Sequence, residues 1–420
     1  MALTTGKTYN PEIVSPAGNL EKLKIAVKFG ADAVYFGGKE FNLRDQAGNF
    51  TLDDIKEAVR ICAGAGAETV FLMNSFLHEK NIEDAKEYIK QIKDFNFNAV
   101  MISDPGMLML LKDAGIKQNI HLSTQMSTLN HYSIRFWNEA GIKRIVLARE
   151  TTLEEIKSIR ESTDAEIEIF AHGALCISYS GRCLLSRFLS GRDANQGSCS
   201  HPCRWNYALV EEKRPGNHLD IIEHAAGTEI LSSKDLSLIG VLPGYVNAGV
   251  NAFKIEGRMK SLYYTANTTR IYKHAVQTII NKNDYDKFLP FYLDELDLVS
   301  HRPYTNDLFN EFNNMSFSEI PYIQKVLFLG YAVSGGGDET EAYIKTFNPI
   351  YLNEEIDAIY PIINSNIRDC KIKVKEITDE IKNESVEMAR PDKIYRIKFD
   401  KAIDNDAILR RRLKIGSKEL

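Results

Sequence analysis

From Glu12 to Asn281 the chain alternates between short apolar runs, rich in Val and Ile, and stretches with helical periodicity. Seven runs follow one another at nearly even spacing, and an eighth comes after a long interruption. The runs are Glu12–Ser15, Ala31–Phe36, Val70–Met73, Ala99–Ser103, His121–Leu122, Arg144–Ala148, Glu166–Phe170 and Ala252–Ile255. Because parallel strands need crossover helices, eight such units predict an α/β fold, a (β/α)8 TIM-like barrel. An open doubly wound sheet is the alternative, and the count of eight favours the barrel.

Pattern and composition divide the chain into three parts. Residues 1–285 are the predicted barrel domain, in which residues 173–250 form a cysteine-bearing insertion between strands seven and eight. The helical pattern ends after Asn281, so residues 286–321, which contain Pro290, are predicted to be a linker. Residues 322–420 predict a small C-terminal all-β, barrel-like domain. Its candidate strands are Lys325–Tyr331, Glu341–Thr346, Glu355–Ile359, Lys371–Ile377 and Lys393–Phe399.

Four of the six cysteines lie in the insertion, separated by six, fifteen and three residues: Cys176, Cys183, Cys199 and Cys203. No signal peptide precedes the chain, so we expect a cytoplasmic protein in a reducing compartment, where a disulfide framework is rare. The wide gaps favour an iron–sulfur cluster held by thiolates. Zinc and unligated thiols stay open as alternatives, since structural zinc sites usually have two closely spaced cysteine pairs. Cys62 and Cys370 are isolated among apolar residues and are expected to be buried fillers.

In a barrel, the residues that follow the strands share one mouth, where the active site lies. The insertion would therefore hold its thiols above this mouth. Four cationic side chains could bind an anionic ligand there, or could instead pair with Glu40, Glu150 or Glu256. These cations are Arg44, Arg149, Lys254 and Arg258. His172 also follows the seventh strand, although a lone histidine is more often a hydrogen-bonded structural residue.

Composition and missing motifs exclude several classes of protein. No apolar run approaches the ~20 residues of a membrane span, so no membrane partner is expected. The formal charge of -5 argues against a wholly basic nucleic-acid binder. Two local basic clusters remain candidate phosphate contacts: Arg182, Arg187, Arg192 and Arg204, and near the C-terminal end Arg410, Arg411, Arg412 and Lys414. The chain has no G-x-S-x-G elbow and no Walker A loop, and His78-Glu79 lacks the second histidine of a zincin.

The segment Glu168–Ser186 contains E-x-F-x-x-G-A-L-C-x4-G-x-C-x-L-S, and it resembles the collagenase-like peptidase family U-32 at every fixed position of that signature. Further stretches resemble the same family, among them SPAGN at Ser15–Asn19, SDPG at Ser103–Gly106 and KIEGRMKS at Lys254–Ser261. The stretch NQGSCSHPCRW, Asn195–Trp205, is most similar to the branch that makes 5-hydroxyuridine at the wobble position of tRNA. The resemblance covers the whole chain, including the C-terminal β domain.

The resemblance implies an RNA-modifying hydroxylase that needs prephenate as co-substrate but no molecular oxygen. It implies a 4Fe-4S cluster on the four insertion cysteines, with tRNA as partner and iron–sulfur assembly proteins as further expected partners. On this basis the expected catalytic residues are His172, Arg44, Arg149, Glu256 and Arg258. Several relatives carry an additional cysteine ligand in a KDL-C motif, where this chain has Ser237. Cys203 is therefore the natural fourth ligand.

Other activities stay open from the sequence. The family was first described as collagenases, so a collagenase-like peptidase is the main alternative, and Cys176 near His172 could be offered as its catalytic pair. Related branches of the family hydroxylate a ribosomal RNA cytidine or ubiquinone precursors. A cluster-bearing RNA-binding scaffold without activity is a further possibility.

Overall fold

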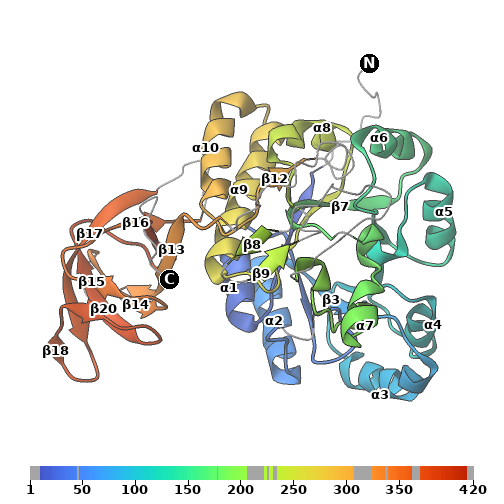
Figure 1. The fold of residues 1–420 in the computed structure, drawn as a ribbon, viewed down its shortest axis with the longest axis horizontal. Coiled ribbons are helices and arrows are strands. Elements are labelled where there is room, and N and C mark those ends of the chain that lie inside the picture. Colours follow the sequence, from blue (N-terminus) through green and yellow to red (C-terminus); the bar gives the residue numbers. More distant parts are fainter. Residues whose placement is uncertain are drawn as a thin grey trace.

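The computed structural model describes residues 10–44, 47–176, 178–205, 222–224, 227–229, 234–306, 323–335, 339–361 and 369–413. A barrel of parallel strands with surrounding helices lies beside a smaller antiparallel β domain (Figure 1). No helix in these ranges combines the length and the apolar character needed to cross a bilayer.

Eight parallel strands close the larger domain. They are β1 Glu12–Pro16, β2 Ala33–Gly37, β3 Glu68–Met73, β4 Ala99–Ile102, β5 Asn119–Leu122, β6 Arg144–Val146, β7 Glu166–Ala174 and β11 Ala252–Ile255. Each pairs with its neighbour in chain order, and β11 pairs with both β1 and β7. The prediction of a (β/α)8 barrel is therefore confirmed, and the open sheet is excluded.

Helices cover the outside of the barrel. They are α1 Leu20–Lys28, α2 Leu52–Ala65, α3 Ile82–Ile92, α4 Pro105–Asp113, α5 His131–Glu139, α6 Leu153–Ser162, α8 Leu242–Asn247 and α9 Leu262–Ile280. Side-chain oxygens satisfy free backbone amides at several helix starts, as in the capping boxes of Thr51 with Asp54 and Thr152 with Glu155. The apolar faces of the helices pack on the strands in one continuous core that includes Phe36, Phe71 and Phe253.

Two short strands extend the sheet beyond the barrel. Strand β10, Asp235–Ser237, runs antiparallel to the end of β7, and β12, Tyr304–Thr305, runs parallel to β10. The insertion also contains α7, Leu185–Ser190, and the hairpin strands β8, Ile222–His224, and β9, Gly227–Glu229. None of these short elements shows a clear hydrophobic periodicity in the sequence, so none was predicted.

The expectation that the helical pattern ends after Asn281 is wrong. Helix α10, Tyr285–Asp297, follows α9 directly and contains Pro290 in its interior. Asp284 caps this helix by accepting a hydrogen bond from the Lys287 amide. Pro290 removes only one intrahelical hydrogen bond, to the Asp286 carbonyl, and the helix is held by packing against α9 instead.

The C-terminal domain is a closed antiparallel β-barrel, as predicted. Its strands are β13 Val326–Gly335, β14 Glu341–Thr346, β16 Glu355–Ile359, β17 Cys370–Asp379, β20 Ile394–Phe399 and β21 Ile408–Arg412. The order β16-β21-β13-β14-β20-β17 closes through a pairing of β16 with β17. The pair β15 Ile350–Tyr351 and β19 Met388–Ala389 and the short strand β18 Glu384–Ser385 complete it.

The C-terminal arginines, candidate phosphate contacts in the sequence, form ion pairs within the protein. Arg410 is buried and donates hydrogen bonds of 2.7 Å to both carboxylate oxygens of Glu295 in α10. Arg411 pairs with Glu354, and Arg412 pairs with Asp357. Lys414 lies outside the described residues.

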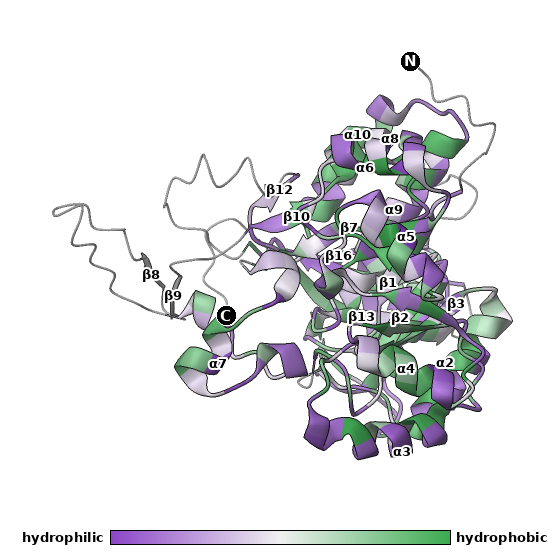
Figure 2. Cartoon of the chain, turned by 90° about the vertical axis from the view of Figure 1, so that its right-hand side faces the viewer, coloured by the Kyte–Doolittle hydropathy of each residue, from purple (hydrophilic) through white to green (hydrophobic). Residues whose placement is uncertain are grey.

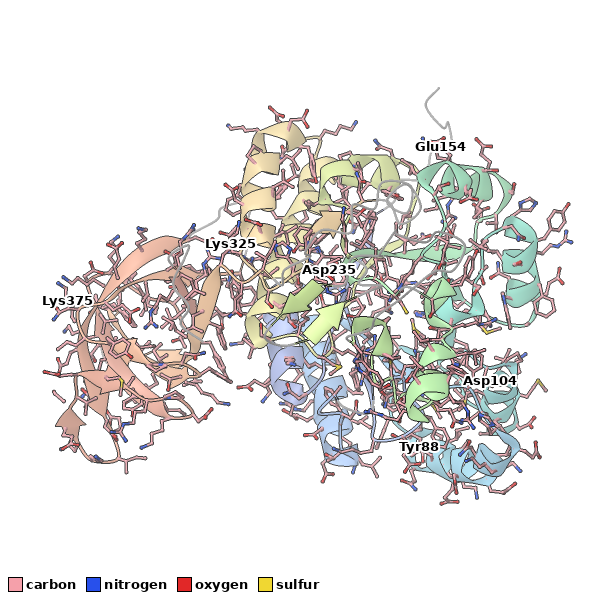
Figure 3. The ribbon with its side chains drawn as sticks, in the orientation of Figure 1. Tyr88, Asp104, Glu154, Asp235, Lys325 and Lys375 are labelled. Atoms are coloured by element: carbon pink, nitrogen blue, oxygen red, sulfur yellow. The ribbon has the colours of Figure 1, made fainter. Side chains whose placement is uncertain are left out.

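Acidic and basic groups thus join the two domains. Arg270 of α9 bonds both Glu295 and Asp369, the residue that precedes β17. Lys325, just before β13, pairs with Asp297 at the end of α10, and Figure 3 shows Lys325 at the junction between the barrel and the β domain. Three apolar residues of the β domain, Val326, Ile359 and Ile408, belong to the main core. The two barrels therefore share one continuous interface.

Candidate functional site

All predicted site residues except His172 meet at a cavity of about 170 Å³ at the carboxyl ends of the barrel strands. All four insertion cysteines line this cavity, together with a set of charged side chains from different strands. The charged residues are Arg44, Arg149, Lys254, Glu256 and Arg258. The structure therefore brings together residues that are more than two hundred positions apart.

Buried hydrogen bonds fix the insertion over the mouth. The Glu150 carboxylate accepts from the backbone amide and from the hydroxyl of Ser180, both at 2.6 Å. Asn195 bonds the backbone of Cys183 in both directions, with distances of 3.3 and 3.1 Å. The cysteine segment is therefore fixed by a barrel residue, Glu150, and by a residue of the segment itself, Asn195.

None of the four insertion cysteines is in a disulfide. Within the described parts of the chain, no three His, Cys, Asp or Glu side chains converge closely enough to ligate one metal ion. A tetrahedral zinc ion would need its sulfur ligands at about 2.3 Å from a single point. All four cysteines line the same cavity, and thiolate sulfur is a ligand both of iron–sulfur clusters and of zinc.

Ser237 occupies a different place. It lies in β10, opposite His172 of β7, and its hydroxyl is 3.5 Å from the Tyr272 hydroxyl. Ser237 does not line the cavity that the four cysteines share. Ser237 is therefore not placed to share a ligand with the four cysteines.

Arg44 and Glu256 form an ion pair across the mouth, with Arg44 Nη2 at 3.1 Å from Glu256 Oε1. Burial favours the neutral acid, but Arg44 and Arg149 hold the pKa of Glu256 below its usual value. Burial likewise opposes the charge of Arg44, and Glu256 raises its pKa nevertheless. Both groups are therefore charged at neutral pH. The sequence had left this pairing open against a free ligand contact.

Arg149 has no carboxylate partner among the described residues. Its guanidinium lies over the Phe170 ring, 4.2 Å from the centroid, and donates to the Ala174 carbonyl at 3.0 Å. The buried Nε atom has no hydrogen-bond partner in that part of the chain. This charge is held in place by an aromatic face and a carbonyl, so it remains available to an anion.

Arg258 is 2% exposed and is held by neutral groups, the amide oxygens of Asn42 and Asn49. Burial lowers its pKa to about 10, so the side chain is still charged at neutral pH. Its Nε also lacks a partner within the described ranges. A Cβ atom on Gly37 would lie only 2.9 Å from Arg258 Nη2, which explains the glycine at the end of β2. Arg258 makes no direct ion pair among the described residues, so an anionic ligand would offset part of the cost of burying its charge.

Lys254 lies deeper, at the floor of the cavity. Its ammonium is 2.9 Å from Glu168 Oε1 and 4.2 Å from the centroid of the Tyr35 ring. Burial lowers the pKa of Lys254, and the nearby Glu168 opposes that change. Lys254 is thus neutralised by the protein, unlike Arg149 and Arg258.

His172 does not line the cavity. It is 1% exposed, and its two ring nitrogens lie 3.3 Å from the Tyr272 hydroxyl and 3.4 Å from the Tyr304 hydroxyl. Burial holds the pKa of His172 well below its usual value, so the ring is neutral. Its ring nitrogens are engaged by tyrosines, which leaves it no part in a catalytic pair with Cys176.

Sequence reasoning did not select three further residues of the cavity wall, Tyr35, Phe170 and His201. Tyr35 donates a hydrogen bond of 2.8 Å to the Ile255 carbonyl, and burial raises its pKa. His201 has a positive φ of 54° and stands between Cys199 and Cys203. The cysteine-rich spacing around His201 was the only available signal for it.

Comparison with known proteins adds independent information. The family model described as peptidase family U32 matches residues 18–316. The chain is 34% identical over 407 residues to "tRNA hydroxylation protein P1" of Bacillus subtilis strain 168, covering 96% of this chain and 95% of that relative. It is 32% identical over 366 residues to "tRNA hydroxylation protein P" of Escherichia coli K12, covering 78% and 79%. It is 37% identical over 278 residues to a 23S rRNA 5-hydroxycytidine synthase of Escherichia coli K12, covering 66% of this chain but 41% of that relative.

Proposed function

The chain belongs to peptidase family U32, and from this membership we propose that it is a tRNA hydroxylase that forms 5-hydroxyuridine at the wobble position. The similarity to tRNA hydroxylation protein P1 extends over both domains, including the C-terminal β-barrel. The similarity to the ribosomal RNA synthase covers less than half of that relative. Full-length correspondence therefore supports tRNA as the substrate over ribosomal RNA.

One observation carries the proposal: four thiols of the insertion and four cations of the barrel line the same cavity. In the proposed enzyme, Cys176, Cys183, Cys199 and Cys203 hold a 4Fe-4S cluster. Such a cluster supplies an iron centre that can exchange electrons. A reducing compartment such as the cytoplasm suits both the free thiols and a tRNA partner.

The cationic wall supports an anionic co-substrate. Arg149 and Arg258 are the two guanidinium groups of the cavity that form no direct ion pair with a carboxylate within the described residues. Prephenate carries two carboxylates, and two arginines match that charge. Independence from molecular oxygen belongs to the same proposal and follows from the family resemblance.

The protein's own side chains would position the reacting groups. The uridine must leave its stack to enter the cavity, because C5 is not accessible inside a stacked strand. The paired Arg44 and Glu256 would stand at the mouth with fixed charges, and Phe170 and Tyr35 provide an apolar wall. His172 is not assigned a catalytic part, since both its nitrogens face tyrosines.

Nucleoside mass spectrometry of tRNA tests the proposal. A strain without this gene should lose 5-hydroxyuridine and the bases derived from it, and the wild-type gene should restore them. Arg258→Gln should fail to restore them, whereas Arg135→Gln, a change on the exposed side of α5, should succeed. Unchanged wobble uridines, with loss of hydroxycytidine in 23S rRNA, would transfer the assignment to ribosomal RNA. Gelatin cleavage by the iron-free protein would instead favour the peptidase alternative.

A further inference from the structure

Helix α7 of the cysteine segment presents its apolar side to solvent. Leu184 is 76% exposed and Phe188 is 85% exposed, whereas Ser186 is 0% exposed. Leu184, Arg187 and Phe188 are spaced i, i+3 and i+4, so they share one face of the helix. A surface helix of a globular protein normally has the opposite arrangement, with apolar residues inward.

A network of serines holds the inner face of α7. The Ser186 hydroxyl donates to the Arg192 carbonyl at 2.7 Å and accepts from the Ser200 amide at 3.1 Å. The hydroxyls of Ser190 and Ser200 lie 2.7 Å apart. These polar groups are satisfied inside the segment, so the outward position of Phe188 is built into the fold.

Other apolar side chains of the same segment are also exposed. We call this set the aromatic rim: Tyr179, Leu184, Phe188, Leu189 and Trp205. Trp205 is 39% exposed, and its indole donates to the Ser200 carbonyl at 3.2 Å, so the same serine anchors both α7 and Trp205. Figure 2 shows α7 away from the main body of the barrel, with both hydrophilic and hydrophobic residues on its short turn. The rim belongs to the segment that also carries the four cysteines of the cavity.

Most charged residues of the cysteine segment itself are arginines. Between Cys176 and Trp205 the sequence has four arginines and one acid, Asp193. That acid accepts from Arg187 at 3.2 Å, and Arg192 is exposed. Exposed aromatic rings among arginines are the combination that binds single-stranded nucleic acid, by stacking of bases and by contacts to phosphates. A protein partner with an apolar patch would not require the arginines.

We propose that the aromatic rim stacks against unpaired nucleotides that flank the modified base, with Phe188 as the main stacking residue. This inference rests on the proposed RNA substrate. When the target base turns into the cavity, its neighbours lose a stacking partner, and an exposed ring on the segment that carries the cavity's cysteines replaces it. The arginines of the same segment hold the adjacent phosphates and give the rim its preference for RNA over an apolar partner.

Binding of a fluorescent oligouridylate to anaerobically purified full-length protein tests the rim, with an RNA duplex of equal length for comparison. Phe188→Ala should weaken binding of the single strand by about 5-fold to 100-fold, the loss of one stacked base. Phe188→Trp should restore it. The matched control is Phe136→Ala, which removes a ring that is 62% exposed on α5. The salt dependence of binding should be the same for wild type and Phe188→Ala, and shallower for Arg192→Ala.

Equal binding by Phe188→Ala and Phe136→Ala would overturn the proposal. Sedimentation of the same proteins tests whether the rim instead binds a second copy of this chain. If Phe188→Ala converts a dimer into a monomer without changing RNA binding, the rim is a contact between copies and the proposal is wrong. Failure of the two proposals is distinguishable. If Phe188→Ala loses RNA binding but the hydroxyuridine of cellular tRNA does not depend on the protein, the rim proposal holds and the hydroxylase proposal is wrong. If tRNA hydroxyuridine depends on the protein but Phe188→Ala binds RNA as Phe136→Ala does, the hydroxylase proposal holds and the rim proposal is wrong.

Discussion

Lys254 Nζ lies 2.9 Å from Glu168 Oε1 inside the barrel, where the two residues are 4% and 0% exposed. Burial lowers the pKa of Lys254. Burial raises the pKa of Glu168, but Lys254 and Arg144 bring it below its usual value. The pair is therefore ionic, and each charge depends on the other.

Lys254→Met should lower the free energy of unfolding by about 3–5 kcal/mol, because it leaves the Glu168 carboxylate buried beside an apolar side chain. Urea denaturation measures the change. The double variant Lys254→Met/Glu168→Gln should recover part of the loss, since it removes the orphaned charge. Lys371→Met, at an exposed pair with Glu355, should leave the unfolding midpoint unchanged. Equal effects of the two single variants would contradict the pairing.

Arg410→Met should separate the unfolding of the two domains. The change removes two hydrogen bonds to Glu295 and one to Tyr263, all at 2.7 Å, and leaves a buried carboxylate with Arg270 alone. We expect a loss of about 3–5 kcal/mol and two calorimetric transitions in place of one. Arg412→Met, at a more exposed arginine that pairs with Asp357, serves as the control and should keep a single transition.

His172 should make the protein less stable as the pH falls below about 6.5. Burial holds its pKa well below that value in the folded state, so between the two pKa values the unfolded chain binds one more proton. Stability rises with pH wherever the unfolded state binds more protons, by up to ~1.4 kcal/mol per pH unit for one group. Unfolding measured from pH 5 to pH 8 should show this slope, and His172→Gln should reduce it. A slope that His172→Gln leaves unchanged would show that other groups cause it.

Cys203→Ser should abolish most of the iron content and visible absorbance of protein purified without air. Cys370→Ser, in the C-terminal barrel, is the matched control and should keep both. Ser237→Ala should also keep them, because Ser237 lies outside the cavity. Colourless wild-type protein with one equivalent of zinc would refute the cluster.

Arg149→Met should weaken prephenate binding by about 10-fold to 100-fold, as expected for the loss of one charge-assisted hydrogen bond. Calorimetric titration of the cluster-loaded protein measures the change. Arg135→Met, at an exposed arginine on α5, should bind as wild type does. Retained affinity in Arg149→Met would place the anion elsewhere in the cavity.

The barrel was predictable because its strands and helices have clear periods, and each strand lies close to its expected place. Helix α10 was missed because Pro290 marks a break in sequence patterns, although a single lost hydrogen bond did not outweigh packing on α9. Strand β21 was missed because its three consecutive arginines look like a solvated tail. Their charges are neutralised by acids that are more than fifty residues away, which no local pattern reveals.

Most residues of the site were predictable from topology, since residues that follow barrel strands meet at one mouth. The ion pairs and hydrogen bonds among these residues were not predictable. Glu256 is 212 residues from Arg44, and the sequence gives no reason for it to choose Arg44 over Arg149. His172 follows the predicted seventh strand like a catalytic residue, but β7 extends through it, pairs there with the antiparallel strand β10, and places the ring beside tyrosines instead of in the cavity.

The junction of β7 and β11 sets an order of assembly. The Ile167 amide bonds the Asn251 side chain across 84 residues, so the cylinder closes only after the whole excursion has been synthesised. Closing so long a loop makes this junction a late event in folding. The cavity beside the four cysteines gains its Lys254, Glu256 and Arg258 wall only when this junction forms, so the complete pocket is a product of the last closure and not of the cysteine segment alone.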